Sequence, residues 1–212
     1  MKNEKDYLND LNEIRSMMER STKFMSLSGL SGIFAGIYAL VASYIVYMLM
    51  NFKVDKLYYT NEELIALNIK SDNIIILSIV TIILAISTAI LLSVKNAHKK
   101  SEKIWNNTAK RLVINLAIPL TTGGIIILLL LKYNLYGWLA PFTLVFYGLA
   151  ILNASKYTYD AMRLLGMTQI ILGLIAMHFI AYSLIIWALG FGIMHIIFGI
   201  YLHYKYEVEN ID

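Results

Sequence analysis

Cysteine is absent from this chain, and only two residues are proline. The absence of cysteine excludes disulfides, thiolate metal sites and a cysteine nucleophile. Charge is also scarce, because charged residues make up 15% of the chain and hydrophobic residues 58%. A water-soluble fold cannot cover that much apolar surface. We therefore expect a membrane protein.

Six stretches contain no Asp, Glu, Lys or Arg, and each is near or above the ~20 apolar residues that cross a bilayer core. They are Phe24–Met50, Asn73–Val94, Leu112–Leu131, Tyr133–Asn153, Leu164–Tyr182 and Ser183–Tyr204. The stretches predict an all-α, polytopic protein in which residues 24–204 form a bundle of six transmembrane helices. The other segments are too short for an independent domain, which takes about 50 residues or more.

The segment before the first span, residues 1–23, carries an apolar stripe formed by Tyr7, Leu11, Ile14 and Met18. Their spacings of four, three and four predict a short amphipathic helix. We expect it to lie on the cytoplasmic face of the bilayer or the bundle, with a docking or dimerisation helix as the alternative. Residues 205–212 form a short tail.

The distribution of basic residues predicts the orientation. Fourteen of the eighteen Lys and Arg residues fall in segments on the same side as the N-terminus, and the other four are Lys53, Lys56, Lys70 and Lys132. The positive-inside rule then places both termini in the cytoplasm, at a bacterial inner membrane. The basic segments are expected to meet anionic lipid headgroups. Nucleic-acid binding is not expected, because no recognition motif accompanies them.

Small residues recur on single faces of three predicted helices. They are Ser28, Gly32 and Gly36, spaced by four, and the pairs Gly29/Gly36, Gly166/Gly173 and Gly192/Gly199, spaced by seven. Such faces let the backbone of another helix approach closely. We expect these residues to pack helices together rather than to contact a ligand.

The last two spans have a recurring glycine pattern. It runs from Gly166-Met167-Thr168-Gln169 and Gly173, through Trp187-Ala188-Leu189-Gly190-Phe191-Gly192, to Gly199-Ile200-Tyr201. This pattern resembles the glycine-punctuated hairpin repeated in HdeD-like acid-resistance membrane proteins. The resemblance implies six spans joined by short loops.

Four further motifs are Ala140-Pro141, Tyr147-Gly148-Leu149-Ala150, Asn153-Ala154-Ser155-Lys156-Tyr157-Thr158 and His195-Ile196-Ile197. With them the whole chain resembles an uncharacterised six-span membrane protein family of Bacteroidota. This second resemblance brings no known activity with it.

A few polar residues lie inside the predicted spans, where an unsatisfied polar group is costly and often functional. They are Asn115, Thr121, Thr122, Gln169 and His195. Gln169 and His195 lie at similar depths, so we expect their side chains to hydrogen-bond across the bundle. We favour a structural role for this polar intramembrane cluster of Gln169, His195, Asn115 and Thr122, with a solute or ligand site as the alternative.

The segment Gly29-Leu30-Ser31-Gly32 matches the Gly-x-Ser-Gly of rhomboid proteases, which also have six spans and a catalytic histidine in the last. Catalysis would require the Ser31 hydroxyl within hydrogen-bond reach of His195. The motif lies in the first span instead of the fourth, and no His-x-x-x-Asn occurs in the second. The four histidines have no i, i+4 pair that would form a helical metal site, so we expect no metal or cofactor.

The residues favour a small integral membrane protein without catalytic activity, in a stress-response, scaffold or partner-binding role. Its expected partners are the lipid bilayer and a protein partner or a second copy of the chain. The first alternative is an uncoupled channel or facilitator for a small neutral solute, in which Pro119 and Thr121-Thr122-Gly123-Gly124 break the third helix. The second is an intramembrane serine protease.

Overall fold

The computed structural model describes residues 23–49, 71–99 and 104–208. Over these ranges the chain forms helices joined by short turns, and contains no strand. Six of the helices are long and apolar enough to cross a membrane, which confirms the predicted fold class. Residues 1–22 of the predicted amphipathic helix and residues 209–212 of the tail lie outside the described residues, so the amphipathic helix stays a prediction.

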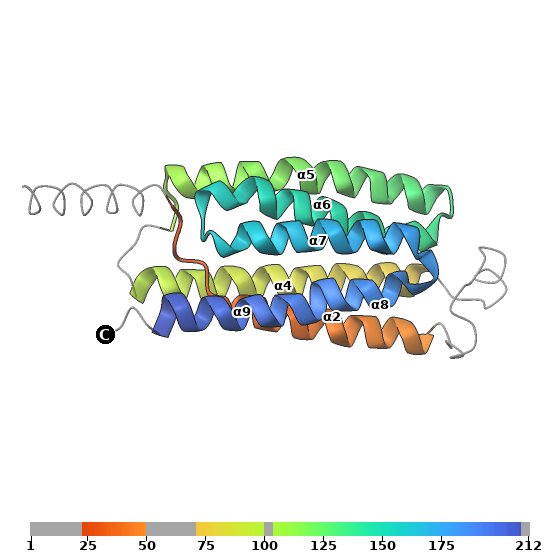
Figure 1. The fold of residues 1–212 in the computed structure, drawn as a ribbon, viewed down its shortest axis with the longest axis horizontal. Coiled ribbons are helices and arrows are strands. Elements are labelled where there is room, and N and C mark those ends of the chain that lie inside the picture. Colours follow the sequence, from red (N-terminus) through yellow and green to blue (C-terminus); the bar gives the residue numbers. More distant parts are fainter. Residues whose placement is uncertain (1–22, 50–70, 100–103, 209–212) are drawn as a thin grey trace, which may run out of the picture.

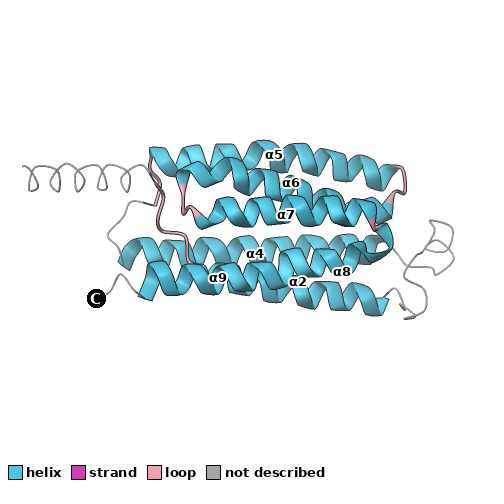
Figure 2. Ribbon diagram, viewed as in Figure 1, coloured by secondary structure: helices cyan, strands magenta, loops and turns pink. Residues whose placement is uncertain are grey.

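The first five spans are each built on one long α-helix: α2 (Gly29–Leu49), α4 (Ser71–Lys99), α5 (Asn107–Lys132), α6 (Leu139–Ala154) and α7 (Ala161–His178). Short 3₁₀ turns precede and follow α6 and follow α7: η1 (Tyr136–Trp138), η2 (Ser155–Tyr157) and η3 (Ile180–Tyr182). The sixth span is one continuous rod of α8 (Ser183–Trp187), η4 (Ala188–Met194), α9 (His195–His203) and η5 (Tyr204–Val208). Figure 2 shows that helix dominates from end to end.

The spans form two layers that lie on one another (Figure 1). One layer holds α5, α6 and α7, in which α6 packs against both neighbours. The other holds α2, α4 and the sixth-span rod, in which α2 packs against both α4 and α9. Parts α8 and η4 of the rod also contact the first layer. The sixth span therefore links the two layers through the middle of the molecule.

The sequence predicts a first span that is helical from Phe24, but its first residues are not helical. Residues 24–28 are apolar or small but are not helical, and α2 begins only at Gly29. The peptide groups of residues 24–27 bond to side chains and a carbonyl from other elements, such as Thr158, Tyr159 and Asn96. These partners replace the intrahelical hydrogen bonds, so an extended course is stable here.

The third span is a regular helix although it contains a proline, and the sixth span is irregular. Helix α5 continues through Pro119 without a break, so the interruption that the channel alternative requires is not found in the third span. The irregular span is the sixth, in which η4 is a π-helix. A π-helical turn contains one residue more per hydrogen-bonded ring than an α-helix and often marks a functional position.

Glycines form the crossing between α2 and the sixth-span rod. A Cβ added at Gly36 would lie 2.6 Å from the carbonyl oxygen of Gly192, and one added at Gly32 would lie 3.2 Å from the Cα of Gly199. A Cβ at Gly199 would itself lie 2.6 Å from the backbone nitrogen of Ile33. The two backbones are therefore in direct contact, as small residues allow in membranes.

A second glycine crossing joins α6 to α7. A Cβ added at Gly166 would lie 2.8 Å from the nitrogen of Leu152, and one added at Gly173 would lie 2.9 Å from the nitrogen of Val145. Gly148 faces the same contact, with the Gly166 carbonyl oxygen 2.7 Å from its added Cβ. Each layer thus contains one pair of helices held at backbone distance.

We expect Gly36→Leu to destabilise the protein, because its side chain would push α2 away from the rod. Overpacking of this kind typically costs about 1–3 kcal/mol, and each kcal/mol lowers Tm by roughly 2–4 °C in a chain of this size. Gly32→Leu should cost less, since its neighbours are farther away. Thermal unfolding in detergent measures both.

Gly124 supplies the matched control, because nothing lies within 4 Å of an added Cβ there. Gly124→Leu should leave Tm unchanged or raise it, since leucine is the better helix former. An unchanged Tm for Gly36→Leu would show that this face of α2 does not pack as described.

Candidate functional site

Gln169, at the middle of α7, carries a fully buried polar side chain. Its relative exposure is 0%. The Nε2 atom donates a 2.7 Å hydrogen bond to the carbonyl oxygen of Gly190, in the π-helical part of the rod. This bond joins the two layers at mid-depth, where no water competes for either group.

The same carbonyl is also the partner of His195. The Nδ1 atom of the imidazole lies 3.0 Å from the Gly190 oxygen, and Nε2 lies 2.7 Å from the hydroxyl of Tyr147 on α6. A carbonyl can only accept, so Nδ1 carries a proton. In the neutral ring Nε2 is then the acceptor, and the Tyr147 hydroxyl donates to it. Gln169 and His195 thus converge on the Gly190 carbonyl, and Tyr147 is linked to it through the imidazole. We call these three residues with Gly190 the central cluster.

The side-chain oxygen of Gln169, Oε1, lies so close to Gly190 that only glycine fits at this position. A Cβ added at Gly190 would lie 2.7 Å from Gln169 Oε1 and 2.6 Å from a methyl group of Leu144. In the described part of the chain, this Oε1 is a buried side-chain acceptor without a conventional hydrogen-bond donor. It faces the Gly190 Cα instead, an arrangement in which weak Cα–H···O contacts form between helices.

Aromatic rings enclose the cluster on one side. Phe191 stacks on His195 with ring centroids 5.7 Å apart, and it also contacts Tyr147 at 4.8 Å and Trp187 at 4.9 Å. The Trp187 indole donates a 3.1 Å hydrogen bond to the Thr143 hydroxyl on α6. The rings pack against one another and against the imidazole beside the hydrogen bonds of the cluster.

The structure does not bring the other two predicted members into the cluster. Asn115 donates to the carbonyl of Arg111, and Thr122 donates to that of Ile118, each within α5. Thr122 is exposed on the outer surface of the bundle. Short polar side chains commonly bond to the preceding turn of their own helix in this way. Gln169 and His195 are brought together, through Gly190 and not through a direct bond.

The Ser31 and His195 pair required for a serine protease is not formed. The Ser31 hydroxyl donates to the Ser28 carbonyl at 2.6 Å, and Gly190 and Tyr147 engage the two ring nitrogens of His195. Across residues 23–49, 71–99 and 104–208, no group of three or more His, Asp or Glu side chains could hold a metal ion.

Two members of the central cluster were not singled out as site residues in the sequence. Tyr147 belongs to a predicted span, and its distance from both ends of that span separates it from the interfacial tyrosines. Gly190 lies two residues before Gly192, within the glycine-rich part of the sixth span. A mid-span tyrosine and a closely spaced glycine pair are thus the signals that would have pointed to them.

The fold and its central cluster define a polytopic α-helical membrane protein in which the buried polar groups bond mainly to one another. Comparison with protein-family models, curated proteins and solved structures finds no match for this chain. The function is therefore argued from the residues and their geometry.

We expect Gln169→Leu and His195→Phe each to fold and to lose little stability, because single interhelical hydrogen bonds in membranes contribute about 0.6 kcal/mol on average. The double variant should lose more than the sum of the two, since Gly190 then keeps neither side-chain donor. Thermal unfolding of the four proteins in detergent gives this coupling directly.

The same variants separate a structural role from a ligand site. A structural cluster predicts that each folded single variant retains the cellular role of the protein. A phenotype equal to that of the gene deletion, in a variant that folds and reaches the membrane, would contradict this and assign the cluster to a ligand.

Proposed function

We propose that the protein is a non-catalytic integral protein of the bacterial inner membrane that acts as a scaffold or binds a membrane partner, in a stress response. The observation that carries this proposal is the closed centre of the bundle. The resemblance of the last two spans to HdeD-like acid-resistance proteins supports the stress-response part. The sequence features and the packing of the helices support the rest.

The centre of the bundle favours a binding role over transport. Leu144 and Gln169 are fully buried against Gly190 of the other layer. Ala150 and Ala176 are fully buried as well. The glycine crossings hold the helices at backbone distance, and the polar groups of the central cluster other than Gln169 Oε1 bond within the cluster. A solute pathway needs polar groups that face a water-filled space, and the buried groups here face one another.

The outer surface offers apolar area for a partner. Helix α4 packs mainly on α2, and Ala97 is the one residue of α4 that is described as buried. Its outward face exposes a row of isoleucines: Ile76, Ile79, Ile83, Ile86 and Ile90. Lipid or the span of another protein, including a second copy of this one, can cover such a face.

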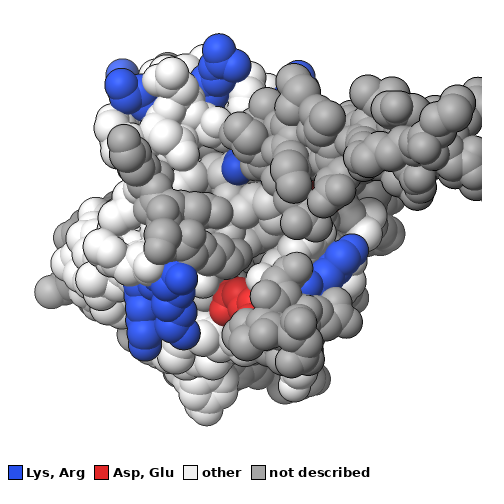
Figure 3. Space-filling model, turned by 90° about the vertical axis from the view of Figure 1, so that its left-hand side faces the viewer, with Lys and Arg blue, Asp and Glu red and all other residues white. Residues whose placement is uncertain are grey.

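One end of the bundle is strongly basic, and we call it the basic end. Figure 3 views the molecule from this end and shows Lys and Arg side chains around its rim. The described basic residues here are Lys23, Lys95, Lys99, Lys110, Arg111, Lys156, Arg163 and Lys205. The described acids at this end, Asp160 and Glu207, are each engaged by a neighbour. This surplus supports a cytoplasmic position beside anionic headgroups.

A facilitator for a small neutral solute is the second candidate. The observation that favours it is the buried Oε1 of Gln169, which has no conventional donor. A solute that donates a hydrogen bond would suit that atom. The continuous course of α5 through Pro119 lends this candidate no support, because the broken helix that would mark a transport site is missing there.

We expect cysteines at Trp105 and Tyr133 to react from opposite sides of the membrane. Both positions are exposed, at opposite ends of α5, and the native chain has no cysteine to interfere. A membrane-impermeant maleimide should label Tyr133→Cys in intact cells and Trp105→Cys only in inverted vesicles. Labelling of both positions from one side would contradict the orientation.

Proteoliposomes test the scaffold against the facilitator. Vesicles that contain the protein should take up glycerol and urea no faster than empty vesicles. Faster uptake that is lost in Gln169→Leu would support the facilitator and overturn the scaffold.

A crosslinking experiment tests for a protein partner. A photo-crosslinking residue at Ile83 should give a discrete protein adduct in cells, and one at the inward-facing Leu144 position, the control, should give none.

A further inference from the structure

The extended residues 23–28 cross from one layer of the bundle to the other at the basic end. Figure 1 shows the segment pass from the α5–α7 layer down to the start of α2. Although it has no helical hydrogen bonds of its own, Ser26 is fully buried and Phe24 is 9% exposed. We call residues 23–28 the strap.

The first half of the strap is bound to the α5–α7 layer. The backbone N–H of Phe24 donates to the Tyr157 carbonyl at 2.7 Å, and its carbonyl accepts from the Thr158 hydroxyl at 3.1 Å. The Met25 carbonyl accepts from the hydroxyl of Tyr159. The Phe24 ring packs with side chains of α5 and α6, namely Ala109, Leu112 and Ala154. Lys23 forms a 2.8 Å ion pair with Asp160.

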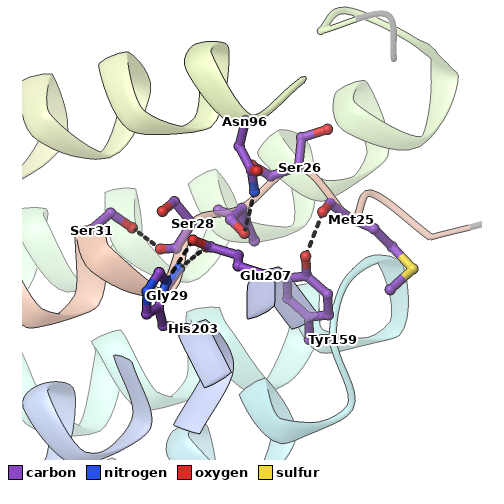
Figure 4. A network of polar contacts seen from close by, with 10 residues as sticks. Met25, Ser26, Ser28, Gly29, Ser31, Asn96, Tyr159, His203 and Glu207 are labelled. Carbon is purple, nitrogen blue, oxygen red and sulfur yellow. Dashed lines mark hydrogen bonds and ion pairs between the residues drawn. The ribbon is translucent and has the colours of Figure 1, made fainter. Parts of the chain in front are cut away.

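The second half is bound to the other layer (Figure 4). The Nδ2 atom of Asn96, on α4, lies 3.4 Å from the Ser26 carbonyl and 3.5 Å from that of Leu27. The N–H of Gly29, the first residue of α2, donates to Glu207 Oε1 at 2.6 Å. The other carboxylate oxygen of Glu207 lies 2.7 Å from Nδ1 of His203. A carboxylate from η5 therefore satisfies an N–H at the start of α2, where negative charge is favourable.

The strap bonds to the α5–α7 layer up to Met25 and to the other layer from Ser26 onwards, so it bridges the two layers. Side chains, and not a sheet or helix ladder, donate to the carbonyls of Phe24, Met25, Ser26 and Leu27. The Ser28 carbonyl accepts from Ser31, at the start of α2. Such bonds contribute modestly one by one, and they can break without unfolding any of the six spans. Because the strap contains no helix or strand, its local opening costs less free energy than unfolding of the whole bundle.

We propose that the strap is a releasable latch that holds the two layers together at the basic end. Seated, it fills the apolar pocket between α5 and α6 with Phe24 and leads directly into Gly29, whose N–H donates to Glu207 of η5. Released, it leaves that pocket open. Because the strap directly precedes α2, a force on the chain before Lys23 acts on the latch first.

Release can be measured at Ser26, because Ser26→Cys changes one atom at a buried position in a chain without cysteine. The variant pair Thr158→Val and Tyr159→Phe removes two donors to the strap and preserves side-chain shape. We expect it to raise the maleimide reaction rate of Ser26→Cys in detergent by about tenfold, since two hydrogen bonds of ordinary strength are lost.

Matched controls use the same substitutions elsewhere. Thr168 bonds within α7, and Tyr182 is exposed at the opposite end of the bundle. Thr168→Val with Tyr182→Phe should leave the Ser26→Cys rate unchanged. A separate cysteine at the buried Ala176 reports on unfolding of the bundle as a whole.

The outcomes decide the proposal. Faster reaction at Ser26→Cys with Ala176→Cys still protected supports a latch that opens by itself. Equal acceleration at both positions would mean that the strap unfolds only with the bundle, and would overturn the proposal. No acceleration at Ser26→Cys would overturn it as well, because the two donors would then not hold the strap.

Discussion

Close approach of helix backbones at glycine is the constraint on which the rest of this bundle depends. Lipid tails are as apolar as leucine, so helices in a membrane associate by packing and by interhelical hydrogen bonds. Gly36 and Gly192 bring α2 against the sixth-span rod, and Gly148 and Gly166 do the same for α6 and α7. The two tight pairs stand in different layers. The two layers therefore contact each other mainly through larger side chains and a small number of polar groups.

The polar groups at the centre bond across the layers to groups that the opposite layer buries. Gln169 reaches the Gly190 carbonyl from α7, and Tyr147 reaches His195 from α6. At the basic end, strap carbonyls accept from side chains of both layers. In a medium without water such bonds do not compete with solvent, so even a few of them specify how the layers are aligned.

Much of the fold follows from local properties of the sequence, because charge-free stretches of bilayer length leave few alternatives to helix. Small-residue spacing likewise points to Gly36 and Gly199 as positions of close packing. The centre is harder to predict, because Asn115 and Gln169 are both polar residues within spans and only tertiary packing decides which one faces inward. The π-helical turn has no strong sequence signature. Proline is a strong sequence signal for a helix break, yet α5 is unbroken at Pro119. The extended strap depends on partners from remote parts of the chain, which no local pattern reveals.

The π-helical turn also has a consequence for the angular register of the last span. Each residue turns an α-helix by about 100°, and a π-helical turn holds one extra residue, so it resets which side chains face inward beyond Met194. His195 is the first residue after that turn, and its imidazole lies at the centre. Glu207 lies in η5, a second π-helical segment, so the direction of its carboxylate depends on both changes of winding. Removal of a single residue from η4 would rotate the imidazole away from its partners and would also turn the segment that carries the carboxylate.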